Sequence, residues 1–220
     1  MSGRSFAGLN EPCEALQEAR ALPGEPHHPN RAMVDTHSGS GEEIIQFAIR
    51  RSSLGLVLIA SSIKGICAIL LGDQEKALTA DLRRRFPKAK RIANQSGLEE
   101  VAAEVVRAVE APGSTQDLPL DLRGTEFQQH VWEALREIPA GSIATYKEIV
   151  QKIGSSKTAQ EVAEACGANP LAVIVPCHRV IRSDGSLAGY RWGLKRKRAL
   201  LEREQEAVPE PGSLFGQTSR

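Results

Sequence analysis

Short apolar runs separated by polar turns dominate the sequence between residues 44 and 71. The runs from Ile44 to Arg50, Gly55 to Ser61 and Gly65 to Leu71 are rich in Ile, Leu, Val and Ala, and the segments between them contain Ser and Gly. Runs of this length, broken by residues of this kind, are typical of strands joined by hairpins. The pattern therefore predicts a small antiparallel sheet.

Helical patterns follow the predicted sheet. The composition of the stretch from Gln74 to Phe86 favours a helix. A second helix is expected where four apolar residues recur on one face, at Leu98, Val101, Val105 and Val109. Pro112 and Gly113 then begin a linker. These features predict a first domain over residues 42–118.

Three threonines mark the starts of the helices predicted in the second half. A threonine at this position accepts hydrogen bonds from free backbone N–H groups, and a Glu or Gln three residues later completes a capping box. The caps are Thr125, Thr145 and Thr158, and the helices extend to Ile138, to about Ile153 and to about Gly167. A short turn containing Gly154 joins the last two helices, which is typical of a helix-turn-helix.

The segments after this helix pair predict a wing and a closing helix. Asp184-Gly185, inside the stretch from Arg182 to Leu187, is a hairpin signal, and a basic helix is expected from Leu194 to Glu204. Residues 122–205 are therefore expected to form a winged helix-turn-helix domain. The predicted fold class is α/β in the α+β sense, with residues 206–220 as a flexible tail.

Residues 1–41 carry Pro, Gly, Ser, His and charge without sustained periodicity, which predicts a disordered leader. A short helix across Glu14 to Ala21 is an alternative there. A metal site in this leader would need Cys13, His27, His28 and His37. Their spacing does not resemble a compact ligand set, so no metal is expected.

Cysteine usage and hydropathy predict a cytoplasmic protein that is not exported. The four cysteines lack the paired spacing of zinc sites or of a secreted disulfide framework. No apolar run approaches the roughly 18 residues that a membrane span needs, and the start of the chain does not resemble a signal peptide.

Basic residues concentrate in one segment, although the formal net charge is only +1. Between Cys177 and Arg203 they are Arg179, Arg182, Arg191, Lys195, Arg196, Lys197, Arg198 and Arg203, against Asp184 and Glu202. Such a patch suggests a polyanion partner, and a solvated helix surface is the alternative. The helix that begins after Thr158 is rich in small residues, which permit a close approach either to a nucleic-acid groove or to a neighbouring helix.

Cys177 is the candidate nucleophile. It ends the apolar, strand-like run Ala-Val-Ile-Val-Pro-Cys, and His178 and Arg179 follow it. A nearby base and a positive charge both favour the thiolate, which is the reactive form. Adjacent side chains on an extended chain point in opposite directions, so His178 would reach the sulfur through a turn or a water molecule. The alternative is a buried cysteine that only packs.

Five motifs extend the pattern around Cys177. They are Phe127-Gln-Gln-His-Val-Trp132, Thr145-Tyr146, Cys166-Gly-Ala-Asn169, Pro176-Cys-His-Arg-Val180 and Gly189-Tyr-Arg-Trp-Gly193. Together they resemble the O6-alkylguanine-DNA alkyltransferase family, in particular the C-terminal methyltransferase half of the bacterial adaptive-response proteins. The resemblance extends weakly upstream to Gly65. It implies a small, ribonuclease-H-like sheet domain followed by a winged helix-turn-helix domain.

The resemblance implies direct reversal of DNA alkylation. Cys177 would accept the alkyl group from O6-methylguanine, and also from O4-methylthymine, and the stable thioether would consume the protein after one reaction. His178 would act as the base through a water molecule, and Glu204 would orient His178, as the acid does in a hydrolytic triad. Tyr146 would donate a hydrogen bond to a base flipped out of the duplex.

The resemblance also implies residues that bind substrate and DNA. Asn169 would brace the turn before Cys177, Tyr190 would line the alkyl pocket, and the Arg191 amide would reach guanine O6. Further contacts with DNA would come from Ala159, Gln160, Ala163 and Arg179. The partner would be double-stranded DNA containing O6-alkylguanine, bound in the minor groove by a monomer that needs no cofactor.

The sequence departs from the family at the recognition helix. The family uses an arginine to fill the space that the flipped base leaves, whereas this chain has Gln160, followed by Glu161 where a small residue is usual. Glutamine lacks the planar, cationic guanidinium, and Glu161 adds negative charge near the phosphates. We therefore expect weaker duplex binding and slower repair. The alternative function is a protein that binds alkylated DNA with weak transfer or none.

Other functions fit the sequence less well. A cysteine hydrolase would need an oxyanion hole, which the sequence does not indicate, and a zinc-dependent base deaminase would need a cysteine in place of Val180. The zinc-thiolate and transcription-activator domains of the larger adaptive-response proteins find no match in this chain. We therefore expect a repair protein without a direct regulatory function.

Overall fold

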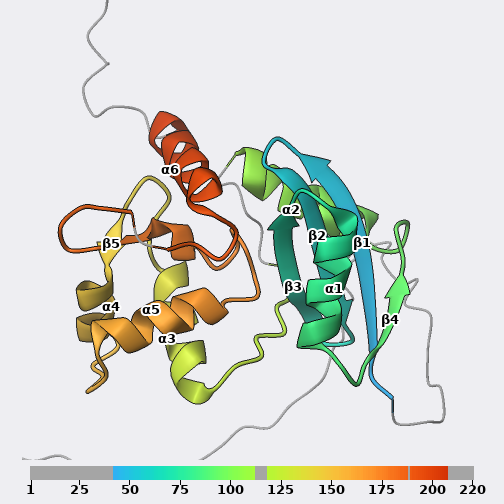
Figure 1. Ribbon diagram of the computed structural model, residues 1–220, viewed down its shortest axis with the longest axis horizontal. Coiled ribbons are helices and arrows are strands. Elements are labelled where there is room, and N and C mark those ends of the chain that lie inside the picture. The colour runs from blue at the N-terminus through green and yellow to red at the C-terminus, as the bar shows by residue number, and fades with distance from the viewer. Residues whose placement is uncertain (1–41, 112–117, 188, 208–220) are drawn as a thin grey trace, which may run out of the picture. The chain divides into compact units, whose positions relative to one another are not determined.

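The computed structural model describes residues 42–111, 118–187 and 189–207 (Figure 1). These residues belong to one compact unit, Gly39–Arg220. The leader predicted over residues 1–41, with its alternative helix and metal ligands, lies outside the described residues, as does the chain beyond Ala207. The division of the described part into two domains stays a prediction.

The three apolar runs form the three strands expected from them. β1 (Ile44–Ser52), β2 (Gly55–Ser62) and β3 (Gly65–Gly72) pair antiparallel. A fourth strand, β4 (Lys90–Ala93), joins β1 in parallel and gives the order β3-β2-β1-β4. The prediction of a purely antiparallel sheet was therefore wrong. This edge strand has only four residues and no apolar alternation, so the sequence carries no signal for it.

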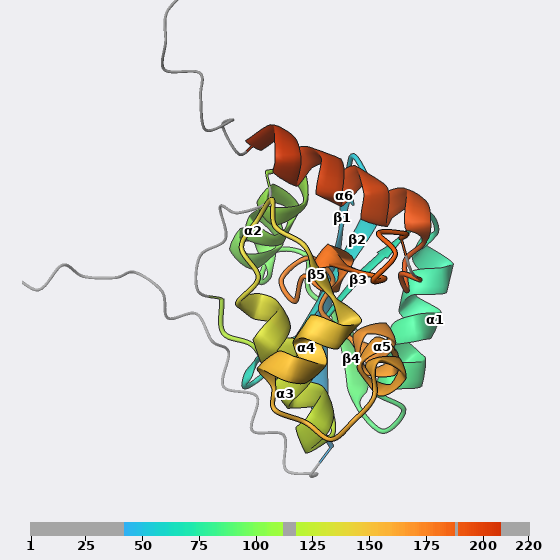
Figure 2. The same cartoon turned by 90° about the vertical axis from the view of Figure 1, so that its left-hand side faces the viewer.

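Two helices cover the sheet. α1 (Glu75–Arg85) contacts β2 and β3, and α2 (Glu99–Glu110) contacts β1 and β2. Figure 2 shows the two helices on opposite sides of the sheet. Both confirm the helices predicted in this region. Their apolar faces close a core in which the central parts of β2 and β3 are fully buried.

The edge of β3 that carries no strand partner is covered by two segments of the second half. The Ile66 N–H donates to the Pro119 carbonyl at 2.8 Å. Farther along, the Ile69 N–H donates to the Pro170 carbonyl at 2.8 Å, and the Ala172 N–H donates to the Ile69 carbonyl at 3.0 Å. These bonds satisfy an otherwise unpaired strand edge. They also fix the chain just before Cys177 against the sheet.

The helices of the second half begin where their caps predict. They are α3 (Glu126–Arg136), α4 (Tyr146–Lys152) and α5 (Ala159–Ala168). Complete capping boxes form at Thr125, Thr145 and Thr158, because each threonine is followed three residues later by Gln or Glu. α5 packs against both α3 and α4. The Trp132 indole N–H donates to the Ala165 carbonyl at 2.9 Å and fixes α3 to α5.

Two expectations for the second half were wrong. The apolar run before Cys177 forms turns and not a strand, because the Asn169 side chain takes up the Leu171 N–H and the Val175 carbonyl on either side of it. The stretch from Arg182 to Leu187 contains the predicted turn but no hairpin strands, because β6 (Val180–Ile181) pairs in parallel with β5 (Ala144–Thr145). The winged form of the helix-turn-helix stays a prediction.

The closing helix, α6 (Leu194–Ala207), confirms the helix predicted from residue 194 and extends two residues into the expected tail. Among the described residues, no helix has the length and apolar character that a membrane crossing requires.

Candidate active site

Asn169 organises the turn that leads from α5 to Cys177. Its side chain is fully buried. Its oxygen accepts from the Leu171 N–H at 2.8 Å, and its Nδ2 donates to the Val175 carbonyl at 2.9 Å and to Cys177 Sγ at 3.2 Å. One amide therefore holds both the backbone of the turn and the sulfur. This geometry supports the bracing role that the resemblance implied for Asn169.

The same turn contains an unusual backbone conformation. Val173 has φ of 68°, in the left-handed region that β-branched residues rarely occupy. Such a residue costs on the order of 1–3 kcal/mol and persists only where the surroundings determine it. The hydrogen bonds of Asn169 with Leu171 and Val175 hold the backbone on either side of Val173 and so fix this conformation. Cys177 then begins η1 (Cys177–Arg179), one turn of 3-10 helix.

Cys177 lies in a buried environment, with 5% of its surface exposed. Burial raises the pKa of its thiol to about 11, while the bond from Asn169 and the charge of Lys197 oppose that rise. The sequence had assigned the favourable cation to Arg179. The structure places Lys197 in that role, and the Cys177 thiol is predominantly protonated at neutral pH.

Lys197 is the residue near the site that the sequence interpretation missed. It was counted in the basic patch, yet its side chain is fully buried, and its Nζ donates to the Val180 carbonyl at 2.6 Å. Burial lowers its pKa. Lys197 and Glu204 are two helical turns apart, which puts them on the same face of α6. That spacing was the available signal, but a lysine in a strongly charged helix is usually exposed.

His178 and Glu204 form a buried pair. His178 Nε2 lies 2.8 Å from Glu204 Oε1, and both side chains are almost completely buried. Burial lowers the pKa of His178, although the bond to Glu204 partly offsets this. The other ring nitrogen, Nδ1, has no hydrogen-bond partner among the described residues. The structure therefore brings together the base and the orienting carboxylate that the sequence predicted.

Arg179 does not fit the DNA-binding role expected for it. Its Nε and Nη2 donate to Glu204 at 2.8–3.0 Å, and its Nη1 donates to the Ile138 carbonyl. The Gly141 N–H also donates to Glu204, at 3.2 Å. Burial alone would raise the pKa of Glu204, but the bonds from His178 and Arg179 outweigh it and lower the pKa to about 2. Arg179 neutralises a buried carboxylate.

Most of the predicted basic patch is likewise paired within the protein. Five of its eight members bind groups of this chain. Arg179 binds Glu204, Arg191 binds Asp81, Arg196 binds Asp73, Lys197 binds the Val180 carbonyl, and Arg203 binds Glu110. Much of the patch is therefore engaged in contacts within the protein. This segment therefore does not form a surface of free basic side chains.

A cavity of about 500 Å³ gathers six of the predicted site residues. It is lined by Tyr146, Ala159, Gln160, Ala163, Gly167, Arg182, Gly189, Tyr190 and Arg191. Burial raises the pKa of Tyr146 to about 12, and the charges of Cys166 and Cys177 add to this rise. The Tyr190 hydroxyl is buried without a hydrogen-bond partner among the described residues, and its pKa is raised by burial and then by Cys177. Tyr190 also lies edge-on to His178, with ring centroids 6.4 Å apart, so this wall of the cavity contacts the residue that follows Cys177.

Gln160 and Glu161 occupy the start of α5. Gln160 is exposed at the cavity, and its Nε2 donates to Glu164 at 3.2 Å. The Glu161 carboxylate instead accepts from the Thr158 N–H at 2.9 Å and pairs with Lys157 at 2.9 Å. These bonds lower the pKa of Glu161 to about 2. Lys157 thus partly compensates the negative charge of Glu161, which the sequence interpretation had treated as uncompensated.

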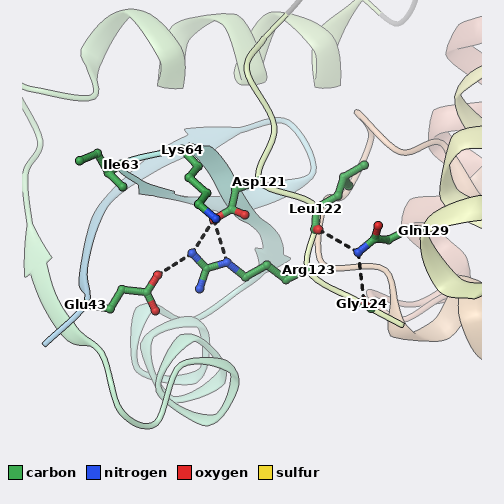
Figure 3. Close-up of a pocket in the computed structure, with 8 residues that line it drawn as sticks. All are labelled: Glu43, Ile63, Lys64, Asp121, Leu122, Arg123, Gly124 and Gln129. Atoms are coloured by element: carbon green, nitrogen blue, oxygen red, sulfur yellow. Dashed lines mark hydrogen bonds and ion pairs between the residues drawn. The ribbon is translucent and has the colours of Figure 1, made fainter. Parts of the chain in front are cut away.

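A second cavity, of about 520 Å³, has a different character. It is lined by Glu43, Ile63, Lys64, Asp121, Leu122, Arg123, Gly124 and Gln129 (Figure 3). Arg123 lies between Glu43 and Asp121 and is ion-paired with both, and Gln129 Nε2 donates to the Gly124 carbonyl at 3.0 Å. These groups bind one another and connect the linker to the sheet. No cysteine lines this cavity, whereas six of the predicted site residues line the first one, so the first cavity is the candidate site.

Known proteins with related sequences and folds place the chain in a family. Residues 126–206 match the family described as 6-O-methylguanine DNA methyltransferase, DNA binding domain. The chain is 38% identical over 155 residues to the inducible methylated-DNA–protein-cysteine methyltransferase of Bacillus subtilis strain 168, covering 69% of this chain and 86% of that protein. The chain belongs to the methylated-DNA–protein-cysteine methyltransferase family.

Two further similarities define its place in that family. A crystal structure of the O6-methylguanine methyltransferase of Mycobacterium tuberculosis has a TM-score of 0.62 and 34% identity, and the match covers 76% of this chain and 96% of that one. This confirms the α/β fold class. The chain is also 46% identical over 167 residues to the bifunctional transcriptional activator/DNA repair enzyme Ada of Escherichia coli strain K12, covering 76% of this chain and 47% of Ada. It spans about half the length of that relative.

Replacing Asn169 with alanine should destabilise the fold. The substitution leaves the buried Leu171 N–H and Val175 carbonyl without their partner, and each such group costs about 1–3 kcal/mol. We expect the free energy of unfolding in urea to fall by at least about 2 kcal/mol. The exposed Gln160→Ala variant is the control, expected to stay within about 0.5 kcal/mol. Equal unfolding midpoints for the two variants would contradict the bracing role.

The His178–Glu204 pair should make stability fall on acidification. Both groups have lowered pKa values, so the folded state binds fewer protons than the unfolded state and stability decreases as pH falls. The loss should begin below about pH 6.5, where unfolded histidine becomes protonated. It should steepen between pH 4.5 and about 2, as Glu204 becomes protonated.

Urea unfolding at stepped pH values measures this dependence. In Glu204→Gln the steep part below pH 4.5 should become shallower, because that position no longer takes up a proton. An unchanged slope in the variant would show that Glu204 does not control the acid transition.

Proposed function

We propose that this protein repairs alkylated DNA by transferring the alkyl group from guanine O6 to Cys177. The proposal rests mainly on the buried His178–Glu204 pair, which directly follows the buried Cys177 in the chain and whose imidazole lies edge-on to Tyr190, a residue that lines the cavity. The similarity to proteins named methylated-DNA–protein-cysteine methyltransferase and O6-methylguanine methyltransferase supports the same reaction. O6-methylguanine is the expected substrate, and O4-methylthymine a further one.

The reaction is a single displacement at the alkyl carbon. Sulfur forms a bond to the methyl carbon while the bond from that carbon to guanine O6 breaks, and the electron pair of the broken bond goes to the purine. The purine takes up a proton, and the Cys177 thiol loses one. The thioether has no good leaving group, so each protein molecule reacts once. This distinguishes it from cysteine enzymes that hydrolyse a thioester and turn over.

The site explains how the proton can leave Cys177. The pKa of the thiol is about 11, so the thiolate must form as the reaction proceeds. His178 is held neutral by burial, and its free Nδ1 can accept a proton. Glu204 fixes the ring through Nε2 and stabilises the imidazolium that results. A water molecule between the sulfur and Nδ1 completes the proposed relay, and the Lys197 charge stabilises the thiolate.

The cavity accounts for the substrate and the partner. Guanine O6 is not accessible to a protein thiol inside a duplex, so the nucleotide must leave the base stack. The cavity lies between the start of α5 and the segment of Tyr190 and Arg191, and Tyr146 closes another side. The small side chains Ala159 and Ala163 let α5 approach the minor groove closely. We propose that a monomer binds duplex DNA in this way and admits the flipped guanine.

Intact mass measurement tests the transfer. Incubation with an O6-methylguanine duplex should replace one hydrogen of the protein by one methyl group, with a stoichiometry of one, and peptide mapping should place it on Cys177. The control is Cys177→Ser, which keeps the shape of the site but removes the thiol. The buried Cys67 and Cys166 should stay unmodified.

The same experiment separates the alternative function. Binding to the alkylated duplex without a gain in mass would favour a protein that only recognises damage, the alternative suggested by Gln160. A methyl group on another cysteine, or transfer by Cys177→Ser, would contradict the proposed nucleophile.

Gln160→Arg should bind alkylated duplex more tightly and repair it faster, each by about tenfold. An arginine at this exposed position adds a cation near the phosphates and a planar group that can occupy the space of the flipped base. Gln160→Lys is the matched control, because it adds the charge without the planar group. Single-turnover rates and duplex affinities at two salt concentrations measure both effects. Unchanged rates in Gln160→Arg would show that this position does not limit base flipping.

A further inference from the structure

The sheet half of the molecule reaches the proposed base cavity through one ion pair. Asp81, in the middle of α1, accepts two hydrogen bonds from Arg191 Nη2, at 3.0 Å to Oδ1 and 3.1 Å to Oδ2. Arg191 itself lines the cavity beside Tyr190. The two residues are far apart in the sequence and belong to different halves of the chain. The contact therefore couples a helix outside the site to the cavity wall.

The Asp81 carboxylate is surrounded by positive charge. Arg84 Nη2 donates to Oδ1 at 3.3 Å, and Arg85 Nε lies 3.7 Å from Oδ2. Arg85 is largely buried, and its Nε and Nη2 have no hydrogen-bond partner among the described residues. Three guanidinium groups thus share one carboxylate. Without that carboxylate the like charges of Arg191 and Arg85 would repel each other without compensation from Asp81.

The segment that carries Arg191 has little support of its own. The described residues between Arg182 and Leu194 form no helix or strand. Gly193 has φ of +96°, and its N–H closes a turn on the Tyr190 carbonyl at 2.9 Å. Tyr190 is buried against His178 and Trp192. The position of this turn, and of the cavity wall it forms, therefore depends on anchors outside it.

We infer that Asp81 is a positioning residue for substrate binding. By holding Arg191, it keeps the turn Tyr190–Gly193 in the place where it closes the cavity, so α1 takes part in recognising the flipped base. The inference rests on the proposed function for its consequence in repair, but the anchoring of the turn itself can be tested separately.

A second ion pair provides a matched control. Asp73, just before α1, pairs with Arg196 at 2.6 Å, and its side chain is 79% exposed, compared with 16% for Asp81. Exposed pairs of this kind contribute little, because water and salt screen them. Arg196 also donates to the Leu54 and Trp192 carbonyls, so it keeps other anchors when Asp73 is replaced. Asp73→Asn therefore removes one carboxylate near α1 while leaving the turn held.

Hydrogen exchange measures the anchoring directly. In Asp81→Asn the amides of residues 190–193 should exchange at least about fivefold faster than in the parent protein, while those of β2 stay unchanged. Asp73→Asn should show no such increase, and Asp81→Glu, which keeps the charge, should restore most of the protection. Equal exchange in Asp81→Asn and the parent would overturn the inference whether or not the protein transfers methyl groups.

Single-turnover kinetics measure the consequence for repair. Asp81→Asn should lower the second-order rate constant on an O6-methylguanine duplex by about tenfold, and the reactivity of Cys177 with a small thiol reagent should stay within about twofold. In a protein that already carries Arg191→Met, adding Asp81→Asn should lower the rate constant no further, because both changes break the same contact. Additive losses in the double variant would contradict action through Arg191. A parent protein that transfers no methyl group would instead refute the proposed function, and the exchange result would stand alone.

Discussion

The arrangement around Cys177 depends on the burial of one carboxylate. Glu204 accepts hydrogen bonds from Arg179 and from the Gly141 N–H and pairs with His178, so it connects α6, η1 and the loop after α3. A buried charge is tolerated only when it is paired and fully hydrogen-bonded. The requirement works in both directions here. The bonds to Glu204 hold the imidazole of His178 in place, and they occupy Arg179, which the resemblance had made a candidate for DNA binding.

The sheet half serves the site as a rigid support. Its β3 edge bonds to the chain at Pro170 and Ala172, a few residues before Cys177, and α1 contacts the cavity wall through Asp81. A reactive group in a turn would otherwise have the mobility that is usual for surface loops. Here one side of the turn is held by a strand edge and its interior by the amide of Asn169. The sheet half thus helps to fix the position of Cys177 but supplies none of the atoms of the proposed reaction.

A buried thiol suits a reaction that occurs once. Solvent-exposed thiolates react readily with oxidants and other electrophiles, whereas Cys177 is buried and its pKa is raised. The charge of Lys197 opposes that rise in the pKa of Cys177, and in the proposed reaction the His178–Glu204 pair would accept the thiol proton. Under the proposed function, burial would protect the reactive sulfur until a flipped base enters the cavity.

Local interactions are the part of this protein that the sequence by itself determined. The three threonine caps, the first three strands and the Cys177-His178 motif act over a few residues, so their signals are readable without knowing the fold. The partners of Arg179, Lys197 and Asp81 were decided only by the tertiary structure. Each depends on a group from a distant segment, and the same charged side chain is exposed or buried according to whether that segment supplies a partner. The turn at Val173 belongs to this second class, because its strained backbone exists only where Asn169 and the sheet edge hold it.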